Sequence, residues 1–388
     1  MISSNTIRTW AGGSTAQPDY TADDFPHSPL VAFYEVTRAC NLLCRHCRAE
    51  AQPHSDPQEL KSATSLALVD DLMKFPKPPL LVLTGGDPIK RRDIFEIVHH
   101  AVASGLKTAM TPSATKLVTT DAVHRLKTAG LHRLAVSLDG PDAPTHDSFR
   151  RVPGSFQRTL EIIADAAACD LPLQINTTIA RHNFHQIDAI ADVLAAFPIV
   201  LWSVFFLVPT GRALADQRIT ADEFELAFEK LYQQGLSRKY GIKTTEAPHY
   251  RRFVLEKMKQ ATGQTADHTA QRPVMPNIVG TNDGRGVMFI SHIGEIFPSG
   301  FLPVQCGRFP RDSVVRTYQH APLFVDLRNS GKLKGKCGAC QYRDICGGSR
   351  ARAYGLTGDP LAAEPDCLYG ESYFQNQNSN RSLPLCSA

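Results

Sequence analysis

The sequence lacks the features that would direct the chain to a membrane or to a nucleic acid. Its longest apolar run, Ile199–Val208, is too short to cross a bilayer. Its first residues contain no apolar core of signal-peptide length. The formal charge is only +4 over 388 residues, with no run of basic side chains, so neither nucleic acid nor membrane is an expected partner. These absences predict a cytoplasmic protein.

A disulfide framework is not expected either, because the cytoplasm is reducing, so the ten cysteines need another explanation. Most of them fall in two groups, Cys40, Cys44 and Cys47 near the start and Cys306, Cys337, Cys340, Cys346 and Cys367 near the end. Cys169 lies in an apolar helical stretch and is expected to be a small core residue. Cys386, in a polar tail, is expected to be incidental. The grouping indicates metal sites.

Between the two groups, short β-branched runs alternate with amphipathic segments. Six strand–helix pairs are expected between about residues 30 and 240, and Thr220 with Glu223 predicts a capping box at one helix start. The alternation predicts an α/β fold with a parallel sheet, as an open doubly wound sheet or a partial barrel. In either, ligands bind at the carboxyl ends of the strands. The first three cysteines directly follow the first strand and are therefore expected there.

The first group has no fourth cysteine, although tetrahedral sulfur sites usually take four. A 4Fe–4S cluster held by Cys40, Cys44 and Cys47 would leave one iron open, as catalytic metal sites leave a position for substrate. A zinc site completed by His46 or His54 satisfies the same ligand chemistry and is the alternative.

The CxxxCxxC spacing after the first strand of such a series resembles that of the radical S-adenosylmethionine (SAM) superfamily. The resemblance covers roughly residues 30–370 and implies a partial (β/α)6 barrel. It implies that SAM chelates the open iron of the 4Fe–4S cluster. One electron then cleaves SAM to methionine and a 5′-deoxyadenosyl radical, which abstracts hydrogen from the substrate.

Further motifs match the family at successive strand ends. TGGD resembles the family's GGE motif, with Asp for the more frequent Glu, which implies that Gly85, Gly86 and Asp87 bind the SAM ammonium group. The resemblance places the other SAM contacts at Ser113, Ser137, Asp139, Arg150, Asn176 and Val208. Ser137 and Arg150 would bind the SAM carboxylate, and Asn176 and Val208 would border the ribose and adenine. On the residues alone, a tight turn at Asp139 and a surface ion pair at Arg150 are the alternatives.

The last quarter of the chain carries a second set of cysteines that can close a four-sulfur site for iron–sulfur or zinc: Cys337, Cys340, Cys346 and Cys367. Their spacing resembles the SPASM extension found behind many radical SAM cores. The complete SPASM pattern has cysteines where this chain has Ser299 and Arg350. The resemblance therefore implies the reduced twitch form, with one auxiliary 4Fe–4S cluster, and Cys306 cannot support another cluster alone.

These motifs divide the chain into an N-terminal tail (1–28), a radical SAM core (29–240), a connector (241–290), a SPASM/twitch domain (291–376) and a C-terminal tail (377–388). Within the connector, His249, Arg251 and Arg252 are expected to bind substrate carboxylates; a solvated connector is the alternative.

Two substrate classes share this architecture. The C-terminal sequence resembles the branch that modifies or decarboxylates side chains of tetrapyrroles in haem and haem d-type biosynthesis. Maturases of ribosomally made peptides are the alternative, but they frequently carry an N-terminal leader-binding domain, for which the tail before the first strand is expected to be too short. A non-enzymatic iron–sulfur protein is a third reading. The expected partners are a tetrapyrrole or short peptide and an electron donor such as flavodoxin or ferredoxin.

Overall fold

The fold is built on one open sheet of ten strands. The structure, a computed structural model, describes residues 20–264 and 280–369. The strand order is β10-β9-β8-β1-β2-β3-β4-β5-β6-β7. The strands are β1 (Val31–Thr37), β2 (Leu80–Gly85), β3 (Thr108–Met110), β4 (Arg133–Ser137), β5 (Leu173–Ile179), β6 (Leu201–Phe206), β7 (Gly241–Thr245), β8 (Val287–Ile290), β9 (Glu295–Phe297) and β10 (Gly307–Arg308). No helix in the described ranges has the length and apolar character needed to cross a membrane.

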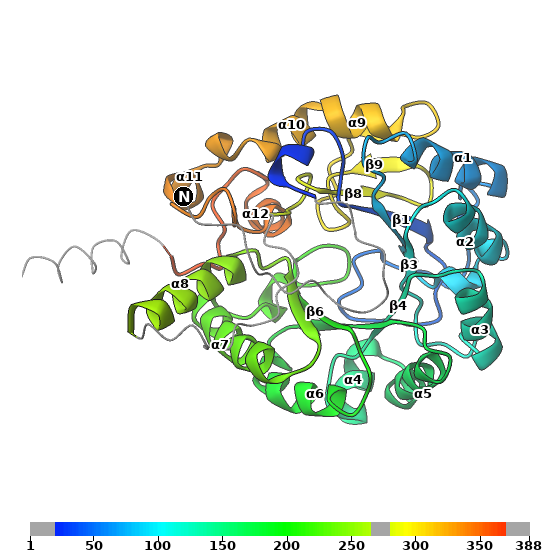
Figure 1. Cartoon of the computed structure of the whole chain (residues 1–388), viewed down its shortest axis with the longest axis horizontal. Helices are drawn as coiled ribbons and strands as arrows, with labels where there is room; N and C mark the ends of the chain where they lie inside the picture. The colour runs from blue at the N-terminus through cyan, green and yellow to red at the C-terminus, as the bar shows by residue number, and fades with distance from the viewer. Residues whose placement is uncertain (1–19, 265–279, 370–388) are drawn as a thin grey trace, which may run out of the picture.

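Strands β1 to β7 are parallel, and each pairs with the next one in the sequence. The curved sheet is covered on its outer side by helices (Figure 1). These helices are α1 (Ser62–Leu72), α2 (Ile94–Ala103), α3 (Thr120–Thr128), α4 (Ala143–Arg150), α5 (Ser155–Ala168), α6 (Ile187–Leu194), α7 (Ala221–Ser237) and α8 (His249–Gln264). Apolar strand residues such as Leu83, Ile175 and Val204 are fully buried against them, which is the driving force for this layer arrangement.

The predicted α/β class and partial barrel are confirmed, and the sheet is not closed. The predicted capping box is also present, because Thr220 Oγ1 accepts a hydrogen bond from the Glu223 amide at 3.3 Å and Glu223 Oε2 accepts one from the Thr220 amide at 2.7 Å.

The segment expected as a connector contains more regular structure than the sequence suggested. Residues 241–290 include β7, α8 and β8, and both strands belong to the same sheet, β7 beside β6 and β8 beside β1. Strand β7 was missed because its five residues, GIKTT, are short and lack an apolar run. The division of the chain into domains remains a prediction.

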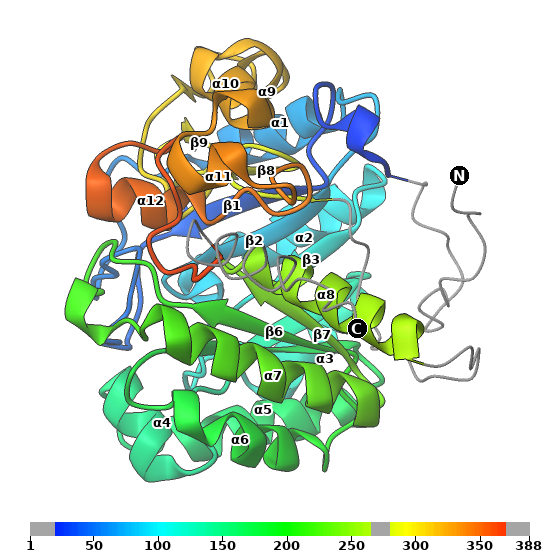
Figure 2. The same ribbon diagram turned by 90° about the vertical axis from the view of Figure 1, so that its left-hand side faces the viewer.

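The C-terminal part extends the sheet and then covers one end of the molecule. Strand β9 pairs antiparallel with β8, and β10 antiparallel with β9. Four further helices follow, α9 (Val314–His320), α10 (Pro322–Arg328), α11 (Gly335–Ala339) and α12 (Arg350–Thr357); Figure 2 shows them on the β8–β9 side. The expected tails lie largely outside the described residues, as does Cys386, but Tyr20 and Phe25 of the first tail are buried.

Candidate active site

The first cysteine group lies in a loop that leaves the carboxyl end of β1. The loop is closed at its base by hydrogen bonds from the Cys40 amide to Gln52 O (2.7 Å) and from the Gln52 amide to Arg38 O (3.0 Å). Two thiols accept backbone hydrogen bonds, Cys40 Sγ from the Leu42 amide at 3.3 Å and Cys47 Sγ from the Ala51 amide at 3.4 Å. Amide donors to sulfur are typical of thiolates that hold iron–sulfur clusters.

All three cysteines line one pocket at the carboxyl ends of the strands. Its volume is about 1140 Å³, including solvent at its mouth. The residues expected to contact SAM line the same pocket, except Asp87 and Asp139: Gly85, Gly86, Ser113, Ser137, Arg150, Asn176 and Val208. Residues from five different strand ends therefore meet around the cysteine loop, as the parallel sheet requires.

The two glycines after β2 allow the cysteine loop to approach closely. A Cβ atom on Gly85, which has φ +147°, would lie 2.2 Å from Thr37 O, and one on Gly86 would lie 2.5 Å from Ala39 O. No other residue fits between β2 and the loop without displacing backbone.

Asp87 was expected to contact SAM, but it does not line the pocket. Its buried carboxylate accepts hydrogen bonds from Thr115 Oγ1 (2.7 Å) and from the amides of Ser113 and Ile89 (both 3.3 Å). Burial raises the pKa of Asp87, although these donors oppose the rise. The carboxylate holds the loop after β3, and through it Ser113, whose Oγ lies 3.3 Å from Cys40 Sγ.

Arg150 is fixed between the pocket and a buried carboxylate. Its Nε and Nη2 donate to Asp139 Oδ2 at 2.6 and 2.5 Å, and Asp139 also accepts from the Thr178 amide at 2.7 Å. Burial opposes the charge on Arg150, but Asp139 outweighs it and raises the pKa of the guanidinium. Asp139 therefore holds Arg150 in the pocket wall. The pair is a buried ion pair, so neither a simple turn at Asp139 nor a surface ion pair at Arg150 describes it.

The zinc alternative finds little support in this geometry. His46 stacks on Phe149, with ring centroids 4.0 Å apart, and His54 is exposed outside the pocket. Burial lowers the pKa of His46 to about 3, which favours the neutral imidazole that zinc also binds, so only the position of the ring counts against ligation. Among residues 20–264 and 280–369, no three His, Cys, Asp or Glu side chains are placed to hold a single metal ion, whereas a polynuclear cluster needs more widely spaced thiolates.

Several pocket residues have no counterpart among the sequence predictions. Arg212, after β6, donates from Nε to Cys44 O and from Nη1 to Ala51 O, both at 3.0 Å. Arg48 pairs with the buried Glu35 at 3.0 Å, and Phe205 and Phe301 form an aromatic pair with centroids 6.2 Å apart. None of them directly follows a strand, since Phe205 lies inside β6 and the other three lie within loops, so no local motif singles them out.

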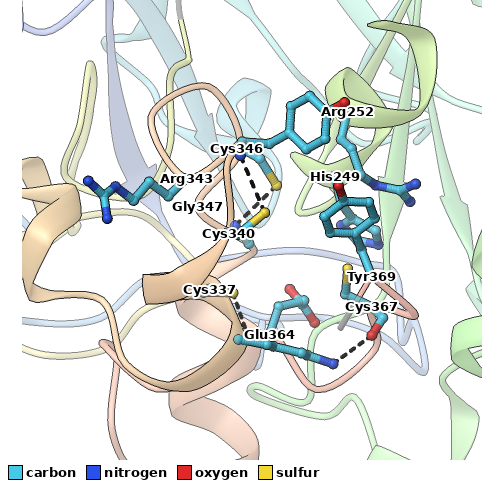
Figure 3. A pocket seen from close by; sticks show the side chains of 13 residues that line it. His249, Arg252, Cys337, Cys340, Arg343, Cys346, Gly347, Glu364, Cys367 and Tyr369 are labelled. Atoms are coloured by element: carbon cyan, nitrogen blue, oxygen red, sulfur yellow. Dashed lines mark hydrogen bonds between the residues drawn. The ribbon is translucent and has the colours of Figure 1, made fainter. Parts of the chain in front are cut away.

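The second cysteine set lines a separate, smaller pocket. Cys337, Cys340, Cys346 and Cys367 surround a space of about 360 Å³ (Figure 3). Three of the thiols accept amide hydrogen bonds: Cys337 from Glu364 at 3.2 Å, and Cys340 and Cys346 from Tyr342 and Gly348 at 3.4 Å. Burial raises the pKa of Cys346 to about 12 and that of Cys367 to about 11, so an occupying metal centre would have to displace their protons.

The residues at the positions of the absent SPASM cysteines have other contacts. The Arg350 guanidinium donates to Cys337 Sγ at 3.8 Å and to Ala362 O at 2.6 Å. Ser299 is buried, and its Oγ accepts from the Phe301 amide at 3.2 Å. Cys306 lines neither pocket, and burial raises its pKa to about 11. Cys169 packs against the core as expected.

The three residues expected to bind substrate carboxylates lie near the second cysteine set and do not line the pocket of the first cysteine group. His249 and Arg252 line the smaller pocket. Arg252 forms ion pairs with Glu225 and Glu256. The Arg251 guanidinium donates to Ile345 O (2.8 Å) and Thr281 O (2.7 Å). Both guanidinium groups are therefore bound within the protein. The segment is helix α8, whose arginines point into the protein, and not a solvated connector.

Comparison with known proteins agrees with this site. Residues 34–194 match the family model described as the Radical SAM superfamily. The chain is 38% identical to an AdoMet-dependent heme synthase of Nitratidesulfovibrio vulgaris, over 91% of this chain and 95% of the relative. It is 36% identical to an AdoMet-dependent heme synthase of Methanosarcina barkeri, over 88% of this chain and 97% of the relative. Among solved structures, Streptococcus suis SuiB bound to S-adenosylmethionine superimposes with a TM-score of 0.65 at 16% identity, over 88% of this chain and 78% of SuiB.

Proposed function

Because this chain belongs to the radical SAM superfamily, we propose that it removes hydrogen from, and decarboxylates, side chains of a tetrapyrrole in haem-type biosynthesis. The chain is an enzyme of this superfamily, whose members use a 4Fe–4S cluster and SAM. When bound, these cofactors supply a carbon-centred radical that takes a hydrogen atom from the substrate. The observation that carries the proposal is the convergence of Cys40, Cys44 and Cys47 with the expected SAM contacts on one pocket.

We assign the residues of that pocket as follows. Cys40, Cys44 and Cys47 hold the cluster, and the amide donors to Cys40 and Cys47 suit it. Arg150, kept charged by Asp139, binds the SAM carboxylate together with Ser137. Backbone at Gly85 and Gly86 binds the ammonium group. Asn176 and Val208 border the ribose and adenine.

Asp87 supports this site indirectly, because its carboxylate accepts from Ser113 and Thr115. Losing it would disturb the loop after β3 rather than remove a cofactor contact.

The tetrapyrrole class is favoured by the relatives and fits the remaining pocket wall. Two relatives that align over nearly their whole length are named AdoMet-dependent heme synthase. The Phe205 and Phe301 rings offer an apolar surface of the kind that a macrocycle packs against. Arg48 lines the pocket with 18% of its side chain exposed, and beyond its ion pair with Glu35 its guanidinium has further donors that can meet a propionate.

We further propose that Cys337, Cys340, Cys346 and Cys367 hold an auxiliary 4Fe–4S cluster that accepts an electron from the substrate. Decarboxylation after hydrogen abstraction releases CO₂ and leaves one electron to be removed. A cluster with four thiolate ligands needs no open iron for that transfer, only burial and hydrogen bonds that set its potential. The four thiols around one pocket and the amide donors to three of them support this assignment.

The reductant for the first cluster is proposed to be a flavodoxin or ferredoxin, in the cytoplasm, where the thiols stay reduced.

The test is anaerobic reconstitution with iron and sulfide, followed by incubation with SAM, a reductant and iron–coproporphyrin III. We expect 5′-deoxyadenosine, CO₂ and a decarboxylated porphyrin detected by mass spectrometry. Formation of 5′-deoxyadenosine without any porphyrin product, together with stimulation by a ribosomally made peptide, would favour the peptide-maturase alternative. Absence of 5′-deoxyadenosine would contradict radical chemistry and favour the iron–sulfur carrier.

A further inference from the structure

His249 is a buried polar side chain whose hydrogen-bonding groups are unused by the described chain. It is the first residue of α8, and its exposure is 0%. In the described residues neither Nδ1 nor Nε2 has a hydrogen-bond partner. Phe224 and Phe228 pack against the imidazole, with ring centroids 4.9 and 4.8 Å away.

An unpartnered buried imidazole needs a physical reason. Leaving a buried donor unsatisfied costs roughly 1–3 kcal/mol, and such groups in native proteins usually signal an unrecorded ligand or a functional role. Packing alone would favour an apolar phenyl ring at this position, because the surrounding side chains already form an aromatic cluster of Phe224, Phe228, Tyr250 and Phe253. The imidazole is therefore not explained by the core around it.

The open side of His249 is the pocket of the second cysteine set. Figure 3 shows His249 and Arg252, both from α8, on the side of the pocket opposite Cys337 and Cys340. Other polar side chains that line the pocket have partners within the protein. Arg252 pairs with Glu225 and Glu256, and Lys336 donates to Cys367 O at 2.5 Å.

We propose that His249 donates an imidazole N–H to the auxiliary cluster and thereby sets its reduction potential. In this role His249 is a hydrogen-bond donor and not a ligand of the iron. This inference rests on the proposed second cluster. Reduction adds negative charge to the sulfur atoms, so a donor stabilises the reduced form more and raises the potential. The cysteine sulfur atoms already accept hydrogen bonds from backbone amides and from Arg350. His249 would add a further donor from the opposite side of the pocket.

The test uses the full chain with Cys40, Cys44 and Cys47 replaced by Ala, so that only the auxiliary cluster remains. His249→Phe, His249→Gln and a matched control, Tyr250→Phe, are introduced in this background. Iron content, thermal unfolding and the potential from an electron paramagnetic resonance titration are measured. Tyr250 is buried on the same helix but does not line the pocket.

We expect His249→Phe to keep its iron and to shift the one-electron equilibrium at least tenfold toward the oxidised form, about 59 mV. His249→Gln, which retains a donor, should recover most of the shift, and Tyr250→Phe should show none. An unchanged potential in His249→Phe with full iron overturns the proposal. Iron loss confined to the His249 variants with an unchanged unfolding temperature, or ligand-strength ¹⁵N coupling from labelled histidine, would also overturn it by showing ligation. Absence of any cluster in the starting background refutes the proposed second cluster instead.

Discussion

Arg150 Nη1 lies 3.7 Å from the sulfur atom of Cys44, although the two residues are 106 positions apart. The other side of the guanidinium is held by Asp139, which itself is fixed by the Thr178 amide from β5. A cation that recognises carboxylates is thereby placed at the edge of the cysteine loop. The pair links the metal-binding loop after β1 to the expected cofactor contacts after β4.

Replacing Arg150 should weaken SAM binding without removing the cluster. A hydrogen bond to a charged group contributes about 1.5–3 kcal/mol, so Arg150→Ala should raise the SAM concentration for half-maximal cleavage by about tenfold to a hundredfold. Arg150→Lys keeps the positive charge but loses the two-pronged guanidinium, so its SAM requirement should lie between those of wild type and Arg150→Ala. Asp139→Asn should act in the same direction by releasing Arg150. Iron content serves as the control, and unchanged SAM affinity in Arg150→Ala would contradict the assigned role.

Each cysteine of the first group should be essential for SAM cleavage. Cys40→Ala, Cys44→Ala or Cys47→Ala removes a thiolate that no described neighbour is placed to replace, because His46 stacks on Phe149 and His54 is exposed. Anaerobic protein should fall from about eight to about four irons per chain, and 5′-deoxyadenosine should be undetectable. Near-normal cleavage in any one variant would refute the cluster assignment.

Local motifs were enough to bring the first cysteine group and most of the expected SAM contacts to one pocket. These residues follow strands of a parallel sheet, and the topology of such a sheet brings the strand ends together. Asp87 shows the limit of that reasoning, since its place after β2 was predicted but its orientation depends on donors from the loop after β3. Arg251 and Arg252 show another limit, because the inward direction of α8 is a tertiary property. Arg212 could not have been found, since its carbonyl partners are 161 and 168 positions away.

The buried Glu35 should give the fold a defined response to acid. Burial alone would raise the pKa of Glu35, but His292, Arg48 and Arg38 outweigh it and lower the pKa from 4.5 to about 2. The unfolded chain therefore takes up this proton first as pH falls. The stabilisation is complete above about pH 4.5 and is lost as the pH falls from there through about 2. One pKa unit is about 1.4 kcal/mol, so the upper bound is about 3.5 kcal/mol.

Glu35→Gln should accordingly lower the free energy of unfolding at pH 7, and the difference from wild type should shrink below pH 4.5. Urea unfolding of both proteins at pH 7 and pH 4 measures this, and comparison at each pH removes contributions from other groups, including cluster loss in acid. A difference that stays constant across this range would show that the charge of Glu35 is not the stabilising feature.

The second cysteine set should separate SAM cleavage from product formation. Wild type should bind about eight irons, and the double variant Cys340→Ala/Cys346→Ala about four, with SAM cleavage retained and decarboxylated product lost. Cys306→Ala should leave the iron count unchanged, because Cys306 lines neither pocket. A wild type with about four irons and one zinc would make the second site structural and remove the electron-accepting role.

Arg212 should control how firmly the first cluster is held. Its backbone amide donates to Cys47 O at 3.0 Å, so the residue contacts the cysteine loop at Cys44, Cys47 and Ala51. The neighbouring Gly211 has φ +58°, and a Cβ there would lie 2.5 Å from Cys47 O, so the segment after β6 is pressed against the loop. Loop mobility exposes a cluster to oxygen and chelators, and two side-chain bonds to carbonyls oppose that mobility.

The first cluster of Arg212→Ala should therefore lose its visible absorbance faster than that of wild type when a chelator is added anaerobically. With about 1.5–3 kcal/mol for each charge-assisted bond, at least tenfold faster loss is expected if loop opening limits the rate. The measurement uses the Cys340→Ala/Cys346→Ala background, in which only the first cluster absorbs. Arg212→Lys, which cannot reach both carbonyls, should bleach at an intermediate rate. Arg218→Ala is the matched control, because Arg218 lies in the same segment but pairs with Asp366, next to Cys367. It should leave the first cluster unaffected, so equal rates for Arg212→Ala and Arg218→Ala would refute the specific clamp on the cysteine loop.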